Sequence, residues 1–335
     1  MAATDKFKNK LRLLYILKIL YEKSNEEHKL SRYDIQEKLA EYGIASERKT
    51  FYDDLAALNE FGIEIISEKD GHDTRYAIVD RRFELAELKI LVDSVQASRF
   101  ITQKKSKELI RKLEGLGSEY DADKLDRFVY SVNKAKTDNE MILCNIDIIY
   151  SAINDDKKIV FNYFDWSSDR KKVLRHNGKR YKISPWALIW DNLNYYLIGF
   201  DEESSSIRHY RVDKMIKLEA DEESRVGKEA FKNFNVGEYS GKLFGMFDGD
   251  EETVTLQVDE SMISVIFDRF GTEIPVRKNE SGAEVDVNVL MSDQFISWVL
   301  ALGNGVKIIS PETVVEKVRK YISERAKLYD VKEDR

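Results

Sequence analysis

Basic and aromatic side chains alternate in residues 181–215, the part of the chain whose residue types are best suited to binding a ligand. A guanidinium group pairs with phosphate through two hydrogen bonds, and an aromatic ring can stack on a base. We therefore expect an anionic ligand that carries a ring, such as a nucleotide or a short single strand of nucleic acid. The side chains predicted to bind it are Tyr163, Lys182, Tyr195, Arg208, His209 and Arg211.

Two apolar runs, residues 186–190 and 195–200, must position these side chains. They have the β-branched and aromatic composition of strands, and the turn residues Asp191 and Asn192 separate them. The two runs and the turn between them therefore predict a pair of antiparallel strands that hold the ligand-binding residues.

Strand alternation limits which of these residues can share a pocket, because successive side chains point to opposite faces. Arg208 and Arg211 fall on opposite faces. One of the two arginines must therefore lie at the rim of the pocket, lie at a bulge in the strand, or bond to Asp213 inside the protein. By the same argument, either Tyr195 or Tyr196 is a core residue.

The window before these strands, residues 170–182, contains seven Lys and Arg residues and no acid. Within it, Asn177-Gly178 favours a tight hairpin turn. The cations could protect an edge strand from pairing, as exposed lysines commonly do. They could instead provide an electrostatic approach for an anionic ligand, which we favour because the window adjoins the aromatic strands.

Residues 181–215 resemble the WYL domain, a family named for a Trp-Tyr-Leu triplet. The triplet here is Tyr195-Tyr196-Leu197, preceded by Pro185 and followed by Gly199-Phe200-Asp201. Residues 208–214 are similar to the basic closing strand of the family. The resemblance implies a small SH3-like β-barrel that binds a ligand, often a nucleotide or single-stranded nucleic acid. It also implies a DNA-binding winged helix ahead of the barrel.

Residues 1–82 carry a pattern that predicts such a winged helix-turn-helix. An amphipathic helix covers residues 7–21, and a capping box at Ser31 and Asp34 starts a second helix. Ser46 can cap a third helix. The apolar face of that helix consists of Phe51, Leu55 and Leu58.

A hairpin of two strands, residues 63–67 and 75–79, follows the third helix and would form the wing. Residues 46–62 resemble the recognition helix and exit turn of DeoR-like regulators that carry WYL domains. An exposed residue near the start of this helix can meet phosphates and base edges. The predicted DNA-binding residues are Ser46, Arg48, Lys49, Thr50, Tyr52, His72 and Arg75. A helical packing module with a solvated face is the alternative, and Asp53 in the middle of that face would repel phosphate.

The rest of the chain divides by pattern into three further parts. Residues 83–139 predict a helical connector, and residues 140–245 hold the WYL-like segment. Residues 246–335 follow the order β-α-β-β-α-β, typical of a ferredoxin-like fold, and resemble the C-terminal extension of such regulators. This last part holds 18 acidic and 11 basic residues, which accounts for the net charge of −7. Its acidity argues against direct contact with DNA.

Composition excludes several other classes of protein. No run approaches the ~18 apolar residues of a membrane-spanning helix, and one cysteine in 335 residues allows no internal disulfide. We expect Cys144 to be a small core residue and the protein to be cytoplasmic. With four histidines and no metal-ligand spacing, paired catalytic carboxylates or phosphate loop, we expect no metal, no cofactor and no enzyme activity.

Together these patterns predict a multidomain α+β transcriptional regulator that acts as a homodimer on double-stranded operator DNA and responds to an anionic effector. Symmetric dimers suit palindromic half-sites about 34–36 Å apart. The alternative is a nucleic-acid processing accessory factor or enzyme regulator, in which the helix-turn-helix mediates protein contacts.

Overall fold

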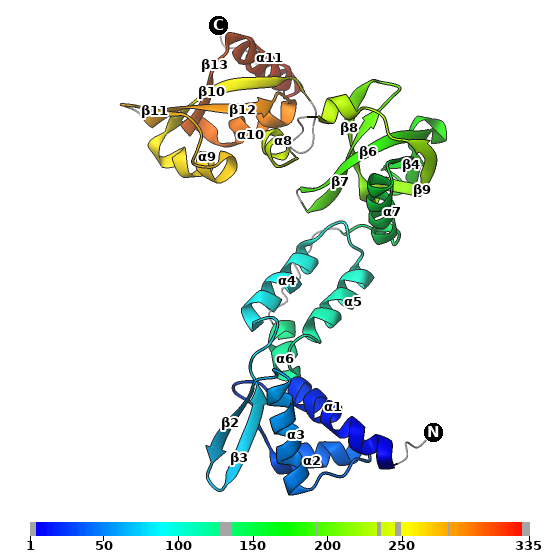
Figure 1. Cartoon of the computed structure of the whole chain (residues 1–335). Coiled ribbons are helices and arrows are strands. Elements are labelled where there is room, and N and C mark those ends of the chain that lie inside the picture. Colours follow the sequence, from blue (N-terminus) through cyan, green and yellow to red (C-terminus); the bar gives the residue numbers. More distant parts are fainter. Residues whose placement is uncertain are drawn as a thin grey trace. The chain divides into compact units, whose positions relative to one another are not determined.

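The chain has a mixed α/β fold with several antiparallel sheets, as expected for a multidomain α+β protein (Figure 1). The computed structural model describes residues 5–127, 136–191, 193–232, 236–244, 249–280 and 282–329. The chain divides into two compact units, Met1–Glu140 and Met141–Arg335. Residues 128–135, at the end of the predicted connector, and the predicted turn residue Asn192 lie outside the described residues.

The first unit begins with three helices and a small sheet. The helices are α1 (Asp5–Lys23), α2 (Arg32–Glu41) and α3 (Arg48–Glu60), and the strands are β1 (Leu30–Ser31), β2 (Ile65–Asp70) and β3 (Asp73–Ile78). The sheet order is β1-β3-β2, and β2 and β3 form an antiparallel hairpin. Ile16, Leu20, Ile35, Leu39 and Phe51 are fully buried between these elements. The predicted order of three helices and a hairpin is thus confirmed, although both strands of the hairpin begin two residues away from their expected starts.

The two predicted helix starts have different outcomes. Ser31 caps α2 as expected: its side chain accepts from the Asp34 N–H, and the Asp34 carboxylate accepts from the Ser31 N–H. Ser46 does not cap α3, because that helix begins at Arg48 and its N-cap residue is Glu47. The Ser46 hydroxyl is buried without a hydrogen-bond partner among the described residues. The prediction for Ser46 as a cap was therefore wrong by one residue.

Three helices follow the wing. They are α4 (Leu85–Ala97), α5 (Gln103–Glu114) and α6 (Glu119–Arg127). Leu88 and Val92 of α4 are buried, as the apolar stripe predicts. The segment between α5 and α6 lies against α1, because the Tyr21 hydroxyl donates to the Leu116 carbonyl at 3.0 Å.

The second unit contains a six-stranded sheet preceded by α7 (Ile142–Asn154). Its strands are β4 (Lys157–Trp166), β5 (Lys172–Leu174), β6 (Arg180–Asp191), β7 (Asn194–Asp201), β8 (Ser206–Arg211) and β9 (Met215–Ser224). The order is β5-β4-β6-β7-β8, and β9 returns to pair with β4. Gly199 permits close packing here, because a Cβ at this position would lie 2.4 Å from Ile183.

The predicted hairpin at Asn177-Gly178 does not form among the described residues, because β5 and β6 do not pair with each other. Both β5 and β6 pair with β4, so the turn crosses from one part of β4 to another. His176, Asn177 and Gly178 all have positive φ, so the expected left-handed backbone is present. The residues Asn177-Gly178 thus predict the backbone conformation of the turn correctly. They do not predict the strand pairing, because β5 and β6 both pair with β4.

The chain ends in an alternating segment of helices and strands. A short helix, α8 (Val236–Lys242), precedes it. The following elements are β10 (Glu251–Asp259), α9 (Ile263–Phe270), β11 (Val276–Asn279), β12 (Gly282–Leu290), α10 (Asp293–Ala301), β13 (Val306–Ser310) and α11 (Glu312–Leu328). Their sheet is antiparallel, with the order β11-β12-β10-β13. The alternation predicted from the sequence is therefore present.

Candidate functional site: a helix face, a junction and a basic pocket

The exposed face of α3 carries the side chains predicted to meet DNA. Phe51, Leu55 and Leu58 are buried, while Arg48 and Lys49 are exposed in the first turn. Tyr52 is 42% exposed at the edge of this face. Thr50 donates its hydroxyl to the Glu47 carbonyl at 2.9 Å, so it also stabilises the start of the helix. Asp53 is exposed as well, as its position in the helical period predicts.

The wing places its two predicted DNA-binding residues differently. His72 is exposed at the turn between β2 and β3. Arg75 is tied into the hairpin, because its Nε donates to Asp70 Oδ2 at 2.6 Å. Burial raises the pKa of Tyr76 to about 12, and its hydrogen bond with Tyr52 adds to that rise. The wing and α3 are therefore linked through a pair of tyrosines.

Two contributors to this face were missed from the sequence. Arg12 pairs with Asp54 at 2.5 Å and holds α1 against α3. Tyr33, at the start of α2, is 60% exposed, and the Arg32 guanidinium lies 4.4 Å from its ring centroid. The pair of Arg12 and Asp54 depends on how α1 and α3 pack, so no local spacing predicts it. The contact of Arg32 with Tyr33 joins neighbours in the sequence.

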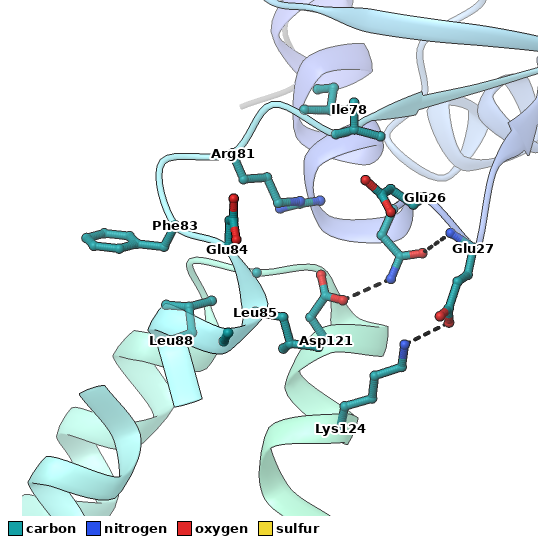
Figure 2. Close-up of a pocket in the computed structure, with 14 residues that line it drawn as sticks. Glu26, Glu27, Ile78, Arg81, Phe83, Glu84, Leu85, Leu88, Asp121 and Lys124 are labelled. Carbon is teal, nitrogen blue, oxygen red and sulfur yellow. Dashed lines mark hydrogen bonds and ion pairs between the residues drawn. The ribbon is translucent and has the colours of Figure 1, made fainter. Parts of the chain in front are cut away.

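A cavity of about 470 Å³ lies between the winged helix and the connector helices, within the first unit (Figure 2). Asn25 Nδ2 donates to Asp121 Oδ1 at 2.9 Å, and the Ser118 hydroxyl donates to Asp121 Oδ2 at 2.6 Å. Arg81 Nη2 donates to the carbonyls of Tyr21 and Ser24 at 2.6 and 2.8 Å. This polar network joins the end of α1 to α6, so it couples the N-terminal helices to the helices that follow the wing.

The Asp121 carboxylate makes this junction sensitive to acid. Burial alone would raise its pKa, but hydrogen bonds from Ser118 and Asn25 outweigh burial, and the pKa lies below its ordinary value. A carboxylate with a lowered folded-state pKa stabilises the folded protein fully above the unfolded-state pKa, about 3.9. That contribution is lost as the pH falls through the lower folded-state pKa.

We therefore expect the docking of α6 to weaken as the pH falls below about 4, and Asp121→Asn to remove this part of the pH dependence. Hydrogen exchange of the α6 amides across this pH range is the measurement. Asp123→Asn is the matched control, because Asp123 is exposed on the same helix. If Asp121→Asn leaves the acid response unchanged, Asp121 does not provide it.

A basic and aromatic pocket of about 600 Å³ lies on the six-stranded sheet, at the turn before β6 and along β8. Its lining residues are Arg175, His176, Lys179, Tyr181, Asp201, Glu203, Ser204, Arg208, His209 and Tyr210. Of the six predicted ligand-binding residues, this pocket contains Arg208 and His209. The Arg208 side chain is exposed, and its Nε donates to the neutral Ser204 hydroxyl at 3.3 Å. His209 Nε2 lies 3.1 Å from the Tyr239 hydroxyl.

The floor of the pocket is aromatic. The Tyr181 ring stacks on Phe161, with centroids 5.5 Å apart, and meets Tyr210 edge-on at 5.7 Å. Tyr163 lies beneath this layer, and the Arg175 guanidinium is 5.0 Å from its ring centroid. Burial raises the pKa of both Tyr163 and Tyr210 above its ordinary value.

The other four predicted ligand-binding residues lie outside the pocket lining. Tyr163 is buried, and its hydroxyl accepts from the Arg211 N–H at 3.1 Å. Lys182 pairs with Asp221 at 3.0 Å and Glu223 at 2.7 Å. The Tyr195 ring stacks on that of Trp190, with centroids 6.1 Å apart.

Arg211 bonds to Asp213 inside the protein. This is one of the three arrangements that strand alternation allowed for Arg208 and Arg211. The Arg211 Nε and Nη2 donate to the two carboxylate oxygens of Asp213 at 3.1 and 2.9 Å. Nη2 also donates to Asn194 Oδ1 at 3.0 Å. Arg211 therefore fixes the end of β8, and Arg208 is the arginine that faces the pocket.

Three protein-family models match separate segments of the chain. Residues 145–220 match the WYL domain, residues 9–70 match the FokI, D3 domain, and residues 250–325 match the WCX domain. The chain is a WYL-domain protein. These three matches fit a WYL-domain transcriptional regulator with a winged-helix-like N-terminal domain.

Two solved structures are similar to the whole chain at low identity. Proteasome accessory factor B/C (PafBC) of Arthrobacter aurescens is 18% identical with a TM-score of 0.29, and the match covers 95% of this chain. The chain spans 49% of the length of PafBC. A CRISPR Cas-related protein is 14% identical with a TM-score of 0.36, and 98% of this chain and 88% of that chain are covered. In a comparison with curated proteins, none matches significantly.

The WYL-domain pocket includes residues that sequence reasoning did not assign to the ligand. Arg175 and Lys179 belong to the seven-cation window, which was interpreted as an approach rather than as the pocket itself. Each already pairs with an acid: Arg175 with Asp165, and Lys179 with Glu203. Tyr181 lies in the same window, and no role was predicted for it. The cation-rich window was the signal that could have found all three.

Three further features of this WYL-domain protein concern its described residues. They contain no group of His, Cys, Asp and Glu residues that could hold a metal ion. Among the described helices, none is both long and apolar enough to cross a membrane. Cys144 is exposed on α7, which corrects the prediction that it is a core residue. The helix turns its Ile142 and Ile149 positions inward instead.

Proposed function

We propose that the chain is a DNA-binding transcriptional regulator whose WYL domain senses a nucleotide or a nucleic-acid-like effector. The observation that carries this proposal is the joint presence of a WYL domain, a WCX domain and a winged-helix-like domain with a basic exposed helix face. In this proposal the protein is cytoplasmic, is not an enzyme, and binds operator DNA as a homodimer through α3.

We further infer an SH3-like barrel for the WYL domain and a ferredoxin-like fold for the C-terminal part. The first inference is supported by β9, which follows the short helical turn Val212–Lys214 and pairs back onto β4. The second is supported by the antiparallel order β13-β10-β12-β11, in which the first strand of the segment lies between the fourth and the third.

The effector pocket is assigned from charge and ring chemistry. Three cations, Arg175, Lys179 and Arg208, line it together with Tyr181. Guanidinium and ammonium groups bind phosphate, and a base can stack on an exposed tyrosine for about 1–3 kcal/mol. This combination favours a phosphorylated ligand with an aromatic ring over an apolar one.

The DNA-binding part of the proposal is tested by replacing Lys49 and Tyr52 with alanine. Neither side chain belongs to the buried face of α3, so the protein should remain folded. Loss of a phosphate contact or a base contact should each cost about 1–3 kcal/mol in operator affinity. A gel-shift titration on bound genomic fragments measures it, with Lys107→Ala on the connector as a control of equal charge. Unchanged operator affinity in the double variant would remove this helix from the DNA interface.

The sensor part is tested with Arg208→Ala. We expect this variant to bind operator DNA like the wild type but to lose its response to nucleotides or short single strands. Thermodynamic reciprocity adds that operator DNA must change effector affinity by the same factor as effector changes operator affinity. Fluorescence titrations with and without operator measure both.

Arg180→Ala is the matched control for Arg208→Ala, because Arg180 pairs with Glu219 at 2.6 Å and does not line the pocket. If the wild type and both variants bind every such ligand equally, the nucleotide-sensor proposal is wrong.

A further inference from the structure

The loop between β7 and β8, residues 202–205, brings carboxylates to the cations of the pocket. We call it the acidic loop, because it begins with two consecutive glutamates, Glu202 and Glu203. Glu203 forms an ion pair with Lys179, a cation of the pocket lining. The hydroxyl of Ser204 accepts from Arg208 Nε at 3.3 Å. Two of the three pocket cations are therefore engaged by neighbouring residues of one loop.

The two glutamates are held with different strength. The Lys179 and Glu203 side chains are 40% and 70% exposed. Glu202 instead accepts from Lys158 at 2.7 Å, and the Lys158 side chain is only 6% exposed. An exposed ion pair contributes little to stability, whereas taking a carboxylate away from a buried cation costs more. The ion pair between Glu203 and Lys179 is thus easier to break than the pair between Glu202 and Lys158.

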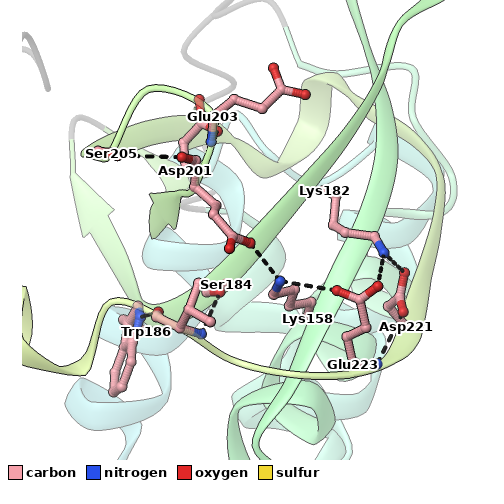
Figure 3. Close-up of polar contacts among 11 residues, drawn as sticks. Lys158, Lys182, Ser184, Trp186, Asp201, Glu203, Ser205, Asp221 and Glu223 are labelled. Atoms are coloured by element: carbon pink, nitrogen blue, oxygen red, sulfur yellow. Dashed lines mark hydrogen bonds and ion pairs between the residues drawn. The ribbon is translucent and has the colours of Figure 1, made fainter.

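Lys158 anchors the base of the loop in a larger network. It also pairs with Glu223 of β9 at 3.1 Å, and Glu223 pairs in turn with Lys182. Figure 3 shows Lys158 beside Glu223, and Lys182 between Glu223 and Asp221, with which it pairs. The network links β4, β9 and the acidic loop, so the loop can open at Glu203 while Glu202 stays attached.

We propose that Glu203 is a built-in competitor for the anionic group of the effector. A phosphate of the incoming ligand takes over Lys179 from the Glu203 carboxylate, and Arg208 exchanges the neutral Ser204 hydroxyl for a charged oxygen. The guanidinium group gains a charged acceptor in place of a neutral one and can pair with phosphate through two hydrogen bonds, so the exchange at Arg208 favours the ligand. The loop then moves about the contact between Glu202 and Lys158. This inference rests on the proposed sensor function of the same pocket and adds its regulation.

The competitor also sets the class of ligand. Because Asp201 and Glu203 both line the pocket, a ligand with a single weak negative charge gains little by displacing a carboxylate of equal charge. A phosphate-bearing chain offers several charged oxygens to Lys179, Arg208 and Arg175 together. The loop therefore selects phosphorylated ligands against simple carboxylates.

The experiment measures binding of a short fluorescein-labelled oligothymidylate to the full-length chain at low salt by fluorescence anisotropy. Glu203→Gln should tighten binding by up to about fivefold, the change that corresponds to about 1 kcal/mol for an exposed pair. In a Lys179→Gln background the same substitution should give no gain, because the pair is already absent. Hydrogen exchange at residues 203–205 should rise when the oligonucleotide binds to the wild type.

Glu222→Gln is the matched control. It removes the same charge from an exposed residue of the same domain, paired with Lys157 at 3.2 Å and absent from the pocket lining. Equal affinities for Glu203→Gln and Glu222→Gln, with weaker binding by Arg208→Ala, would contradict the proposal that Glu203 competes with the ligand. The proposed sensor function of the pocket would still hold. If neither the wild type nor Glu203→Gln binds the oligonucleotide, both the sensor and the competitor fail.

Discussion

Replacing Phe51 with alanine is expected to lower the free energy of unfolding of the N-terminal unit by about 3–5 kcal/mol. Phe51 is fully buried at the centre of the winged-helix core. Its ring meets those of Tyr52 and Tyr76 edge-on, with centroids 5.6 Å away in both cases. Truncation removes these contacts and leaves a cavity that the surrounding helices cannot fill completely. Urea denaturation of the full chain, followed through hydrogen exchange of the α1–α3 amides, measures the loss in this unit.

Lys49→Ala provides the comparison on the same helix. Its side chain is exposed, so the expected change in stability is within about 0.5 kcal/mol. Phe51→Ala should thus destabilise the unit without removing an exposed side chain of α3. Lys49→Ala should leave the stability nearly unchanged and weaken DNA binding. A loss below about 1 kcal/mol for Phe51→Ala would contradict the packing of α3.

The buried face of α3 was predictable because helical periodicity is local. Phe51, Leu55 and Leu58 repeat at the spacing of one helix face, and all three are buried. The capping box at Ser31 is local in the same way. Ser46 is not the cap because α3 begins two residues later and has Glu47 as its N-cap residue. The Ser46 carbonyl accepts from the Gln36 side chain, a tertiary contact that local spacing does not predict.

The pocket was harder to predict because its residues come from separated segments. Alternation along β8 showed that Arg208 and Arg211 differ, but it could not say which one faces a ligand. That choice depends on Asn194 and Asp213, which receive Arg211 on the inner side. The acids that pair with Lys182 lie some forty residues later on β9. Composition can mark a basic window, but it cannot show which cations are already paired.

Cys144 illustrates the same limit on a helix. A single small apolar residue in an apolar run was expected to be buried, because cysteine is among the most buried residue types. The orientation of α7 is set by Ile142, Asn145, Ile149 and Ala152, all of which are buried. Cys144 therefore falls on the solvent side.

Removal of the Asp213 carboxylate is expected to destabilise the WYL domain by about 3 kcal/mol. Asp213 is only 7% exposed, and it accepts two hydrogen bonds from Arg211. In Asp213→Ala the guanidinium keeps one bond to Asn194 but loses its counter-charge in a half-buried site. The estimate lies at the lower end of the range for a buried pair, because the Arg211 side chain is still 35% exposed. Glu219→Ala, which breaks the exposed pair with Arg180, should cost less than about 1 kcal/mol.

The double variant Arg211→Ala with Asp213→Ala tests whether Arg211 stabilises the fold by pairing with Asp213 or contacts the ligand. If the arginine serves only to pair with Asp213, removing both residues should cost less than removing Asp213 alone, because no unpaired charge remains. Urea denaturation measures the stability of the three variants, and anisotropy with the labelled oligothymidylate measures binding. We expect the double variant to bind the oligonucleotide as the wild type does, since Arg211 lies outside the pocket lining. A large loss of affinity in a folded double variant would return Arg211 to the effector site and would show that the pocket extends past β8.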